Sequence, residues 1–359
     1  MIDFELTEEQ QALIDIARRF AREKIIPVAP ECDRKSEFPM EVFKEAWKIG
    51  LVNPTLPAEY GGPGLSDLDS VLVTEELAYG CSGIQTSITA NTLGLTPIKL
   101  AGSEEQKKKY LGMLMSEPMH VSYATTEPGA GSDVAGMQCR AVKQADGGYV
   151  LTGTKAWITN ANLSRFYVIF ATENPELKHK GIGAFIVERD AKGLSIGKHE
   201  DKLGQRASDT AQVMLDGVYV PPAQVLAPPG HGFKLAMETF NQTRPDIGGI
   251  ACGIMKRCLD ESVKYAKERK TFGTAIANHQ LVAAMIAEMA IRLNATRLLV
   301  HKAAWSLDKG IRDPLTSACA KAYGADAAMQ SATDAVQVFG GNGYVKEYPV
   351  EKLMRDAKL

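Results

Sequence analysis

Apolar residues near the beginning of the chain recur every three or four positions, which is the spacing of an amphipathic helix. The first run starts at Thr7 and Gln10, a pair that fits a capping box. It continues with Leu13, Ile16, Ala17, Phe20 and Ala21. The same spacing predicts further helices at about 41–50, 69–79 and 104–111. Residues 1–119 are therefore expected to form a helical lobe.

The pattern changes near His120, where short runs of β-branched and aromatic residues alternate with Gly, Asn and Asp. Such runs predict strands at 149–153, 155–159, 166–170, 184–187 and 213–215. Short strands at this spacing favour a small all-β lobe over residues 120–228. Pro228, Pro229 and Gly230 mark the end of this lobe.

Helix-forming residues return from Phe233 onward, with apolar side chains again three and four positions apart. They predict long helices at 233–268, 279–308 and 313–338. Long helices with short connections favour a bundle over residues 229–359. The order helical, β, helical predicts an α+β protein of three lobes. It argues against a doubly wound sheet, and no Gly-x-Gly-x-x-Gly string follows a predicted strand.

Charge and composition exclude several classes of function. The net charge is −2, so the chain has no general attraction for nucleic acid or for an anionic membrane. No apolar stretch reaches the roughly 18–20 residues of a membrane-spanning helix, and the acidic N-terminus does not resemble a secretory signal. The 6 cysteines form no Cys-x-x-Cys pair, which favours reduced thiols in the cytoplasm. The 6 histidines lack metal-ligand spacing, so no metal is expected.

The densest candidate for ligand binding is the string from Tyr123 to Asp133. Gly129 and Gly131 allow backbone N–H groups to approach a ligand closely, and Thr126 and Ser132 add hydroxyl groups. Such a loop suits the polar edge of a flavin or a phosphate. From the spacing alone, a tight turn without a ligand is the favoured interpretation.

This string resembles one flavin-contacting signature of the acyl-CoA dehydrogenase family, and Trp-Ile-Thr-Asn at 157–160 resembles a second one. Further matches follow in the family's order at 241–245, 268–273, 279–280 and 337–344. Shorter matches at 60–62 and 348–356 extend the resemblance over most of the chain. Among the branches of the family, the chain is most similar to the medium-chain enzymes. The resemblance implies a helical N-terminal lobe, a small β-barrel-like lobe and a four-helix-bundle-like C-terminal lobe.

The resemblance also implies an FAD cofactor. The expected FAD contacts are Tyr123, Thr125, Thr126, Gly131, Ser132, Trp157, Ile158, Thr159, Arg269, Thr271, Phe272, His279, Gln280, Gln337, Gly340 and Gly341. By resemblance, Trp157 packs on the isoalloxazine and Thr159 forms a hydrogen bond near its reactive nitrogen; a core aromatic is the alternative for Trp157. The contacts from Arg269 onward would partly serve the FAD of a neighbouring subunit, which implies a homodimer or homotetramer. A solvated, charged helix end is the alternative for 268–273.

The expected substrate contacts are Ser132, Asn241, Thr243, Arg244, Gln85 and Thr89. By resemblance, Thr89 replaces a Glu at the floor of the acyl pocket of the medium-chain enzymes, which leaves more room there. Asn241 replaces an Asp beside the CoA. Without the resemblance, Arg244 equally fits a buried arginine paired with a carboxylate.

The implied activity is FAD-dependent α,β-dehydrogenation of a short- or medium-chain acyl-CoA to the trans-2-enoyl-CoA, with electrons passing to an electron-transferring flavoprotein. This activity belongs to fatty-acid β-oxidation, in the cytoplasm or in the mitochondrial matrix. The alternatives are an acyl-CoA oxidase, an enoyl-CoA reductase, and a non-dehydrogenating flavoprotein of the DNA-associated alkylation-response branch.

The catalytic base is missing from its usual place. In the family it is a glutamate in a Tyr-Glu-Gly-Thr string, which would lie a few residues beyond Leu359, or a glutamate at the position of Thr243. We therefore expect the base to lie beyond Leu359. Asp246, one helical turn after Thr243, is the alternative within the chain. An acidic residue near a helix start, or near a kink after Pro245, is the simpler interpretation of Asp246.

Overall fold

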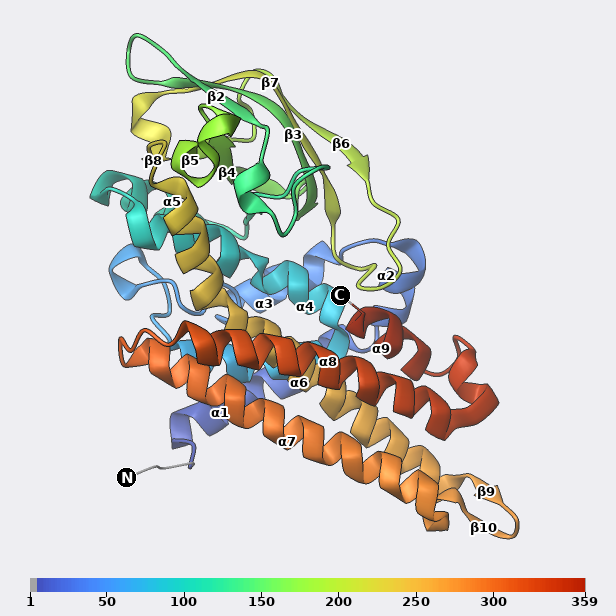
Figure 1. Ribbon diagram of the computed structural model, residues 1–359. Helices are drawn as coiled ribbons and strands as arrows, with labels where there is room; N and C mark the ends of the chain where they lie inside the picture. Colours follow the sequence, from blue (N-terminus) through green and yellow to red (C-terminus); the bar gives the residue numbers. More distant parts are fainter. Residues whose placement is uncertain (1–4, 359) are drawn as a thin grey trace.

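The computed structural model describes residues 5–358 of the chain. In Figure 1 a sheet lies above layers of helices that come from both ends of the chain. The order of the lobes is helical, β, helical, as the sequence predicts. Within residues 5–358, no helix has the length and apolar character needed to cross a bilayer.

The N-terminal lobe consists of helices and short helical turns. They are α1 (Glu8–Phe20), the π-helical turn η1 (Ala21–Ile25), α2 (Ala29–Lys35), α3 (Met40–Lys48), α4 (Asp67–Ala101) and α5 (Glu104–Ser116). The predicted capping box is present: the Gln10 N–H donates to Thr7 Oγ1 at 3.2 Å, and the Thr7 N–H donates to Gln10 Oε1 at 3.1 Å. The expected end of α5 at Leu111 is wrong. The helix continues through Gly112, because burial of Leu114 on its next turn outweighs the low helix propensity of one glycine.

α4 is much longer than the segment 69–79 that the periodicity predicts. It begins at a capping box formed by Ser66 and Asp69, and its backbone leaves helical geometry only at Cys81 (φ −167°, ψ 116°). Most of its side chains are buried on every side of the helix. The predicted segment ends at Tyr79, next to the kink at Cys81, so the periodicity covers only the part of α4 that precedes the kink.

The central lobe is an 8-stranded sheet in the order β6-β7-β3-β2-β4-β5-β8, with β1 paired parallel to β4. Its strands are β1 (His120–Ala124), β2 (Arg140–Lys143), β3 (Tyr149–Thr159), β4 (Ser164–Thr172), β5 (Ile182–Glu188), β6 (Leu194–His199), β7 (Thr210–Val220) and β8 (Val225–Ala227). The sequence pattern misses β1, β2, β6 and β8, and the segments predicted at 149–153 and 155–159 form one strand. β1 is buried along its whole length and shows no alternation of polar and apolar residues.

β4 separates two cores. Phe166 and Phe170 face the core shared with α5 and α6, whereas Tyr167 and Ile169 face the core among the strands. Because both faces of β4 are covered, its sequence is a continuous apolar run rather than an alternating one.

The C-terminal lobe is built on long helices. They are α6 (Gly232–Glu268), α7 (Gln280–Asp308) and α8 (Pro314–Phe339), followed by the turn η7 (Gly340–Tyr344) and the short helix α9 (Val350–Ala357). A hairpin of β9 (Lys270–Thr271) and β10 (Thr274–Ala275) connects α6 to α7. In Figure 1 this hairpin projects at the end of the molecule farthest from the sheet.

α6 packs against α4 through glycines. A Cβ added at Gly253 would lie 2.4 Å from the carbonyl oxygen of Glu75 and 2.6 Å from the Cβ of Ala78. A Cβ added at Gly249 would lie 3.1 Å from Cγ2 of Thr74. The missing side chains therefore allow the two helix backbones to approach closely.

Gly253→Ala is expected to lower the free energy of unfolding by about 1–3 kcal/mol, because the new methyl group would overlap the backbone of Glu75. Gly112→Ala is the matched control, since its added Cβ would meet nothing within 4 Å. The control should raise the free energy of unfolding by about 0.5–1 kcal/mol through helix propensity. Urea denaturation of both variants measures the difference, and shifts of the same sign would contradict the packing argument.

Candidate functional site

β1 leads directly into the loop that the sequence singles out. The N–H of Glu127 donates to the carbonyl of Ala130 at 3.0 Å, and the N–H of Ala130 donates back at 3.1 Å, which closes a tight turn. A Cβ added at Gly129 or Gly131 would meet no atom within 4 Å. The loop therefore has open space above its backbone, as the close approach of a ligand requires.

The second signature lies beside this loop, at the end of β3. The pairing of β3 with β7 is interrupted by a bulge between Lys155 and Ile158. Trp157 lies in the bulge with a φ of 59° and is 59% exposed. The interpretation of Trp157 as a core aromatic is therefore wrong, because the bulge turns the indole out of the sheet. The N–H of Ala156 donates to the carbonyl of Thr126 at 2.9 Å and joins the two signatures.

Buried polar atoms in this part of the molecule lack partners. Neither the hydroxyl of Tyr123 in β1 nor the amide oxygen of Gln85 on α4 has a hydrogen-bond partner among residues 5–358. Burial raises the pKa of Tyr123, so its hydroxyl stays protonated. Since buried polar groups in proteins are normally paired, these atoms fit the polar groups of a bound molecule. Together with the open glycines and the exposed indole, they fit a flavin.

The signatures lie where the lobes meet. Asn160, which follows the second signature, donates from Nδ2 to the carbonyl of Ser87 on α4 at 2.9 Å. The ring of Tyr123 lies 5.7 Å from the ring of Phe240 on α6. Ser87 is two residues from both Gln85 and Thr89 on α4. The candidate flavin contacts therefore lie next to the helix that carries the candidate acyl-pocket residues.

The candidate substrate residues are already linked in pairs. On α4, Gln85 Nε2 donates to Thr89 Oγ1 at 2.6 Å. On α6, Arg244 Nη1 donates to Asn241 Oδ1 at 2.8 Å. The hydrogen-bond partner of Arg244 is thus an amide oxygen, not the carboxylate of the alternative interpretation. Thr243 is buried in α6, and its hydroxyl donates to the carbonyl of Thr239, one turn earlier in the helix.

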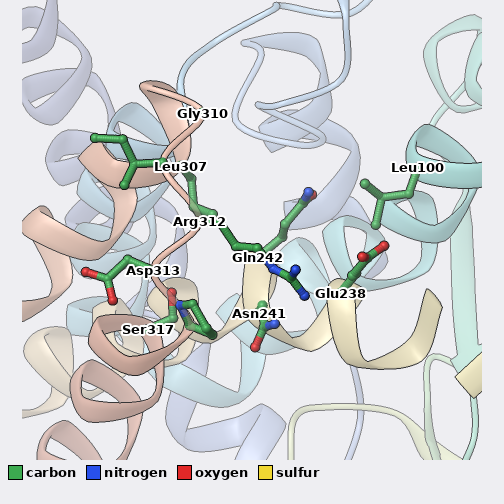
Figure 2. A pocket seen from close by; sticks show the side chains of 11 residues that line it. Leu100, Glu238, Asn241, Gln242, Leu307, Gly310, Arg312, Asp313 and Ser317 are labelled. Carbon is green, nitrogen blue, oxygen red and sulfur yellow. The ribbon is translucent and has the colours of Figure 1, made fainter. Parts of the chain in front are cut away.

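A cavity of about 340 Å³ opens between α6 and the connection from α7 to α8 (Figure 2). Glu238, Asn241 and Gln242 line it from α6, and Arg312 lines it from the connection. In Figure 2 the side chain of Arg312 extends toward Glu238 and Gln242. No motif in the sequence points to Arg312 or Glu238. A charged residue in a short connection carries no periodic signal, and only the fold places Arg312 opposite Asn241.

Asp246 lies one turn after Thr243 in α6 and is turned toward α4. Ser70 Oγ donates to Asp246 Oδ1 at 3.1 Å. Burial, with the nearby charge of Asp67, raises the pKa of Asp246 to about 7. No helix starts at Asp246, because α6 begins at Gly232 and runs through this position, with Pro245 inside the helix. A carboxyl with this pKa exchanges its proton near neutral pH.

The remaining candidate FAD contacts lie on the surface, away from the loop and the bulge (Figure 1). In the hairpin after α6, Thr271 Oγ1 lies 3.0 Å from His279 Nε2, and Phe272 is 98% exposed with a φ of 51°. Arg269 and Gln280 flank this hairpin, and Gln337, Gly340 and Gly341 are exposed at the end of α8. Within one chain, the structure does not bring these residues to Trp157.

Comparison with known proteins decides the family. Models of the N-terminal, middle and C-terminal domains of acyl-CoA dehydrogenases match residues 7–118, 122–218 and 230–359. A protein of Caenorhabditis briggsae, named probable medium-chain specific acyl-CoA dehydrogenase 2, mitochondrial, is 44% identical over 361 residues. The match covers 100% of this chain and 87% of that protein. The chain belongs to the acyl-CoA dehydrogenase family.

Solved structures agree with this assignment. Butyryl-CoA dehydrogenase from Megasphaera elsdenii superposes with a TM-score of 0.96 at 36% identity, over 99% of this chain and 94% of that chain. PigA in complex with FAD superposes with a TM-score of 0.93 at 29% identity, over 99% of this chain and 94% of that chain. The protein is therefore an FAD-dependent oxidoreductase that dehydrogenates acyl-CoA.

Asp246→Asn should reveal the raised pKa of this half-buried carboxyl through the pH dependence of stability. The folded-state pKa is raised, so the folded state binds the proton more tightly, and ionisation destabilises it as the pH rises from about 4 through 7. The variant keeps an acceptor for Ser70 but cannot ionise. The free energy of unfolding of the variant minus that of the unaltered protein should therefore increase by about 2 kcal/mol between pH 4.5 and 8.

Urea denaturation at these two pH values measures the effect. Asp216→Asn, at an exposed position on β7, is the control and should show no such trend. A constant difference between the Asp246 variant and the unaltered protein would contradict the raised pKa.

Proposed function

We propose that this enzyme oxidises short- or medium-chain acyl-CoA thioesters to the trans-2-enoyl-CoA in fatty-acid β-oxidation. Its electrons pass to an electron-transferring flavoprotein. The observation that carries the proposal is the junction of the loop after β1, the bulge of β3 and the Gln85–Thr89 turn of α4. Thr89 is short and its hydroxyl is bonded to Gln85, which leaves room for an acyl chain of moderate length.

In this proposal the FAD site is shared between two copies of the chain. Tyr123–Ser132 and Trp157–Thr159 of one copy hold the flavin. Arg269–Gln280 and Gln337–Gly341 of the other copy reach its diphosphate and adenine. The exposed apolar side chains Leu281, Ile291 and Leu298 on α7 and Leu315 on α8 support a dimer or tetramer, because such side chains favour contact with a second copy.

We further propose that the domains span residues 1–119, 120–228 and 229–359. The connections between α5 and β1 and between β8 and α6 support these boundaries. The proposed place of action is the cytoplasm or the mitochondrial matrix, without a nucleic-acid or membrane partner.

Bound FAD supplies the hydride acceptor for the β-carbon of the acyl group. The protein holds the thioester against the flavin and places hydrogen-bond donors where charge develops on the thioester carbonyl. A carboxylate removes the α-proton. Asp246, with its pKa of about 7, is the candidate within residues 5–358, although Ser70 holds it toward α4.

Anaerobic addition of straight-chain acyl-CoAs to the FAD-loaded protein tests the activity. Visible absorbance should bleach with four- to eight-carbon substrates, and the enoyl-CoA should appear in equal amount. Adding an electron-transferring flavoprotein should restore the absorbance, whereas rapid oxygen uptake without it would indicate an oxidase. Absence of bleaching with every acyl-CoA would contradict the proposal. Unchanged bleaching by Asp246→Asn would exclude Asp246 as the base.

Arg312→Gln tests whether the cavity between α6 and the α7–α8 connection takes part of the CoA. Loss of a charge-assisted hydrogen bond to a phosphate costs about 1.5–3 kcal/mol, so KM for an acyl-CoA should rise about tenfold or more with little change in kcat. KM for the matching acyl-pantetheine, which lacks the nucleotide, should not change. Lys309→Gln, an exposed cation in the same connection, is the control. Equal effects on both substrates would contradict the assignment.

A further inference from the structure

The two flavin signatures are joined by an ion pair buried inside the β lobe. Lys155 Nζ lies 2.7 Å from Glu127 Oε1; the lysine side chain is 0% exposed and that of Glu127 is 6% exposed. The same ammonium donates to the carbonyl of Thr125 at 3.1 Å. Charged side chains are almost never buried so deeply unless they are paired. Neither residue has a part in the chemistry described above.

The carboxylate of Glu127 is held from a second direction. Its Oε1 accepts the backbone N–H of Cys139 at 3.0 Å, and its Oε2 accepts that of Gln138 at 2.6 Å. Both donors lie directly before β2. The thiol of Cys139 also lies beside the pair, and burial raises its pKa to about 11, so it stays neutral. The base of the loop is therefore fixed to the sheet by charge-assisted hydrogen bonds.

The bulge in β3 completes this arrangement. Lys155 pairs with Val213 of β7, and the next paired residue of β3 is Ile158. Between them, the N–H of Ala156 turns to the carbonyl of Thr126. Thr125 and Thr126 are thus held by two consecutive residues of β3, one through its side chain and one through its backbone. The next residue of β3 is Trp157.

We propose that Glu127 and Lys155 are positioning residues for FAD. The ion pair locks the loop to the bulge, so that Thr125, Thr126 and Trp157 have a fixed relative position before the flavin binds. A site ordered in advance loses less free energy to ordering when the ligand binds. The pair acts through the loop and touches no reacting atom. The inference rests on the FAD site of the proposed function and on no property of the substrate. The competing explanation is that it only stabilises the β lobe.

Lys155→Met, Glu127→Gln and the double variant test the proposal. Leu151→Ala is the control, because Leu151 is fully buried in the same strand and precedes the bulge between Lys155 and Ile158, with only the separate register shift at Leu151–Gly153 beside it. Three quantities are measured: the dissociation constant of FAD, the visible circular dichroism of the flavin at saturating FAD, and the melting temperature of the apoprotein. Each single variant should raise the dissociation constant about tenfold or more and change the dichroism. The double variant should recover part of the affinity, because no unpaired charge stays buried.

The control separates positioning from stability. Leu151→Ala should lower the melting temperature but leave the dichroism at saturating FAD unchanged. If the single variants behave like Leu151→Ala in all three measurements, the pair is structural and the inference is overturned. Glu127→Gln keeps the shape of the side chain, so it decides the question even if Lys155→Met does not fold. All three readouts are independent of substrate, so a failure of acyl-CoA to bleach the flavin would leave this inference standing.

Discussion

The burial of α4 on every side is the constraint on which the rest of the structure depends. A helix without an exposed face must satisfy its polar side chains through neighbouring elements. Asn91 does so by accepting the N–H of Val121 in β1 at 2.9 Å and by donating to the carbonyl of Met119 at 3.0 Å. Glu75 does so through Arg297 of α7. These contacts set the positions of the sheet and of the C-terminal helices relative to the N-terminal lobe.

Charge fixes the register of the helices around α4. Glu76 is almost fully buried and is paired with Arg18 of α1 at 2.9 Å and with Lys256 of α6 at 2.5 Å. Removing one partner of a buried ion pair costs about 3–5 kcal/mol, because the other charge is left without compensation. A shift of α1 or α6 along α4 would break such pairs. Gly249 and Gly253 of α6 also oppose such a shift, because only residues without a side chain fit where the two helix backbones are in contact.

The site follows from this arrangement. The candidate flavin segments belong to the sheet, where a bulge and a buried ion pair hold them. The candidate acyl-pocket residues belong to α4 and α6, the helices that meet through the glycine contact. Apart from Ser132, which is a candidate contact for both FAD and substrate, the two sets of candidate residues lie on different elements. A change at Thr89 of α4 would therefore alter the proposed acyl pocket without touching the loop after β1.

The amino-acid sequence by itself determined the order of the lobes, the capped start of α1, the long C-terminal helices and the family. These features depend on local backbone preferences and on short strings of neighbouring residues. The tertiary structure alone decided the length of α4, the existence of β1, the exposure of Trp157, the place of Arg312 and the raised pKa of Asp246. A hydrophobic pattern shows which face of a helix or strand is buried and which face is exposed to water. Elements covered on both sides lack that surface, and a pKa or a cavity depends on residues that only the fold brings together.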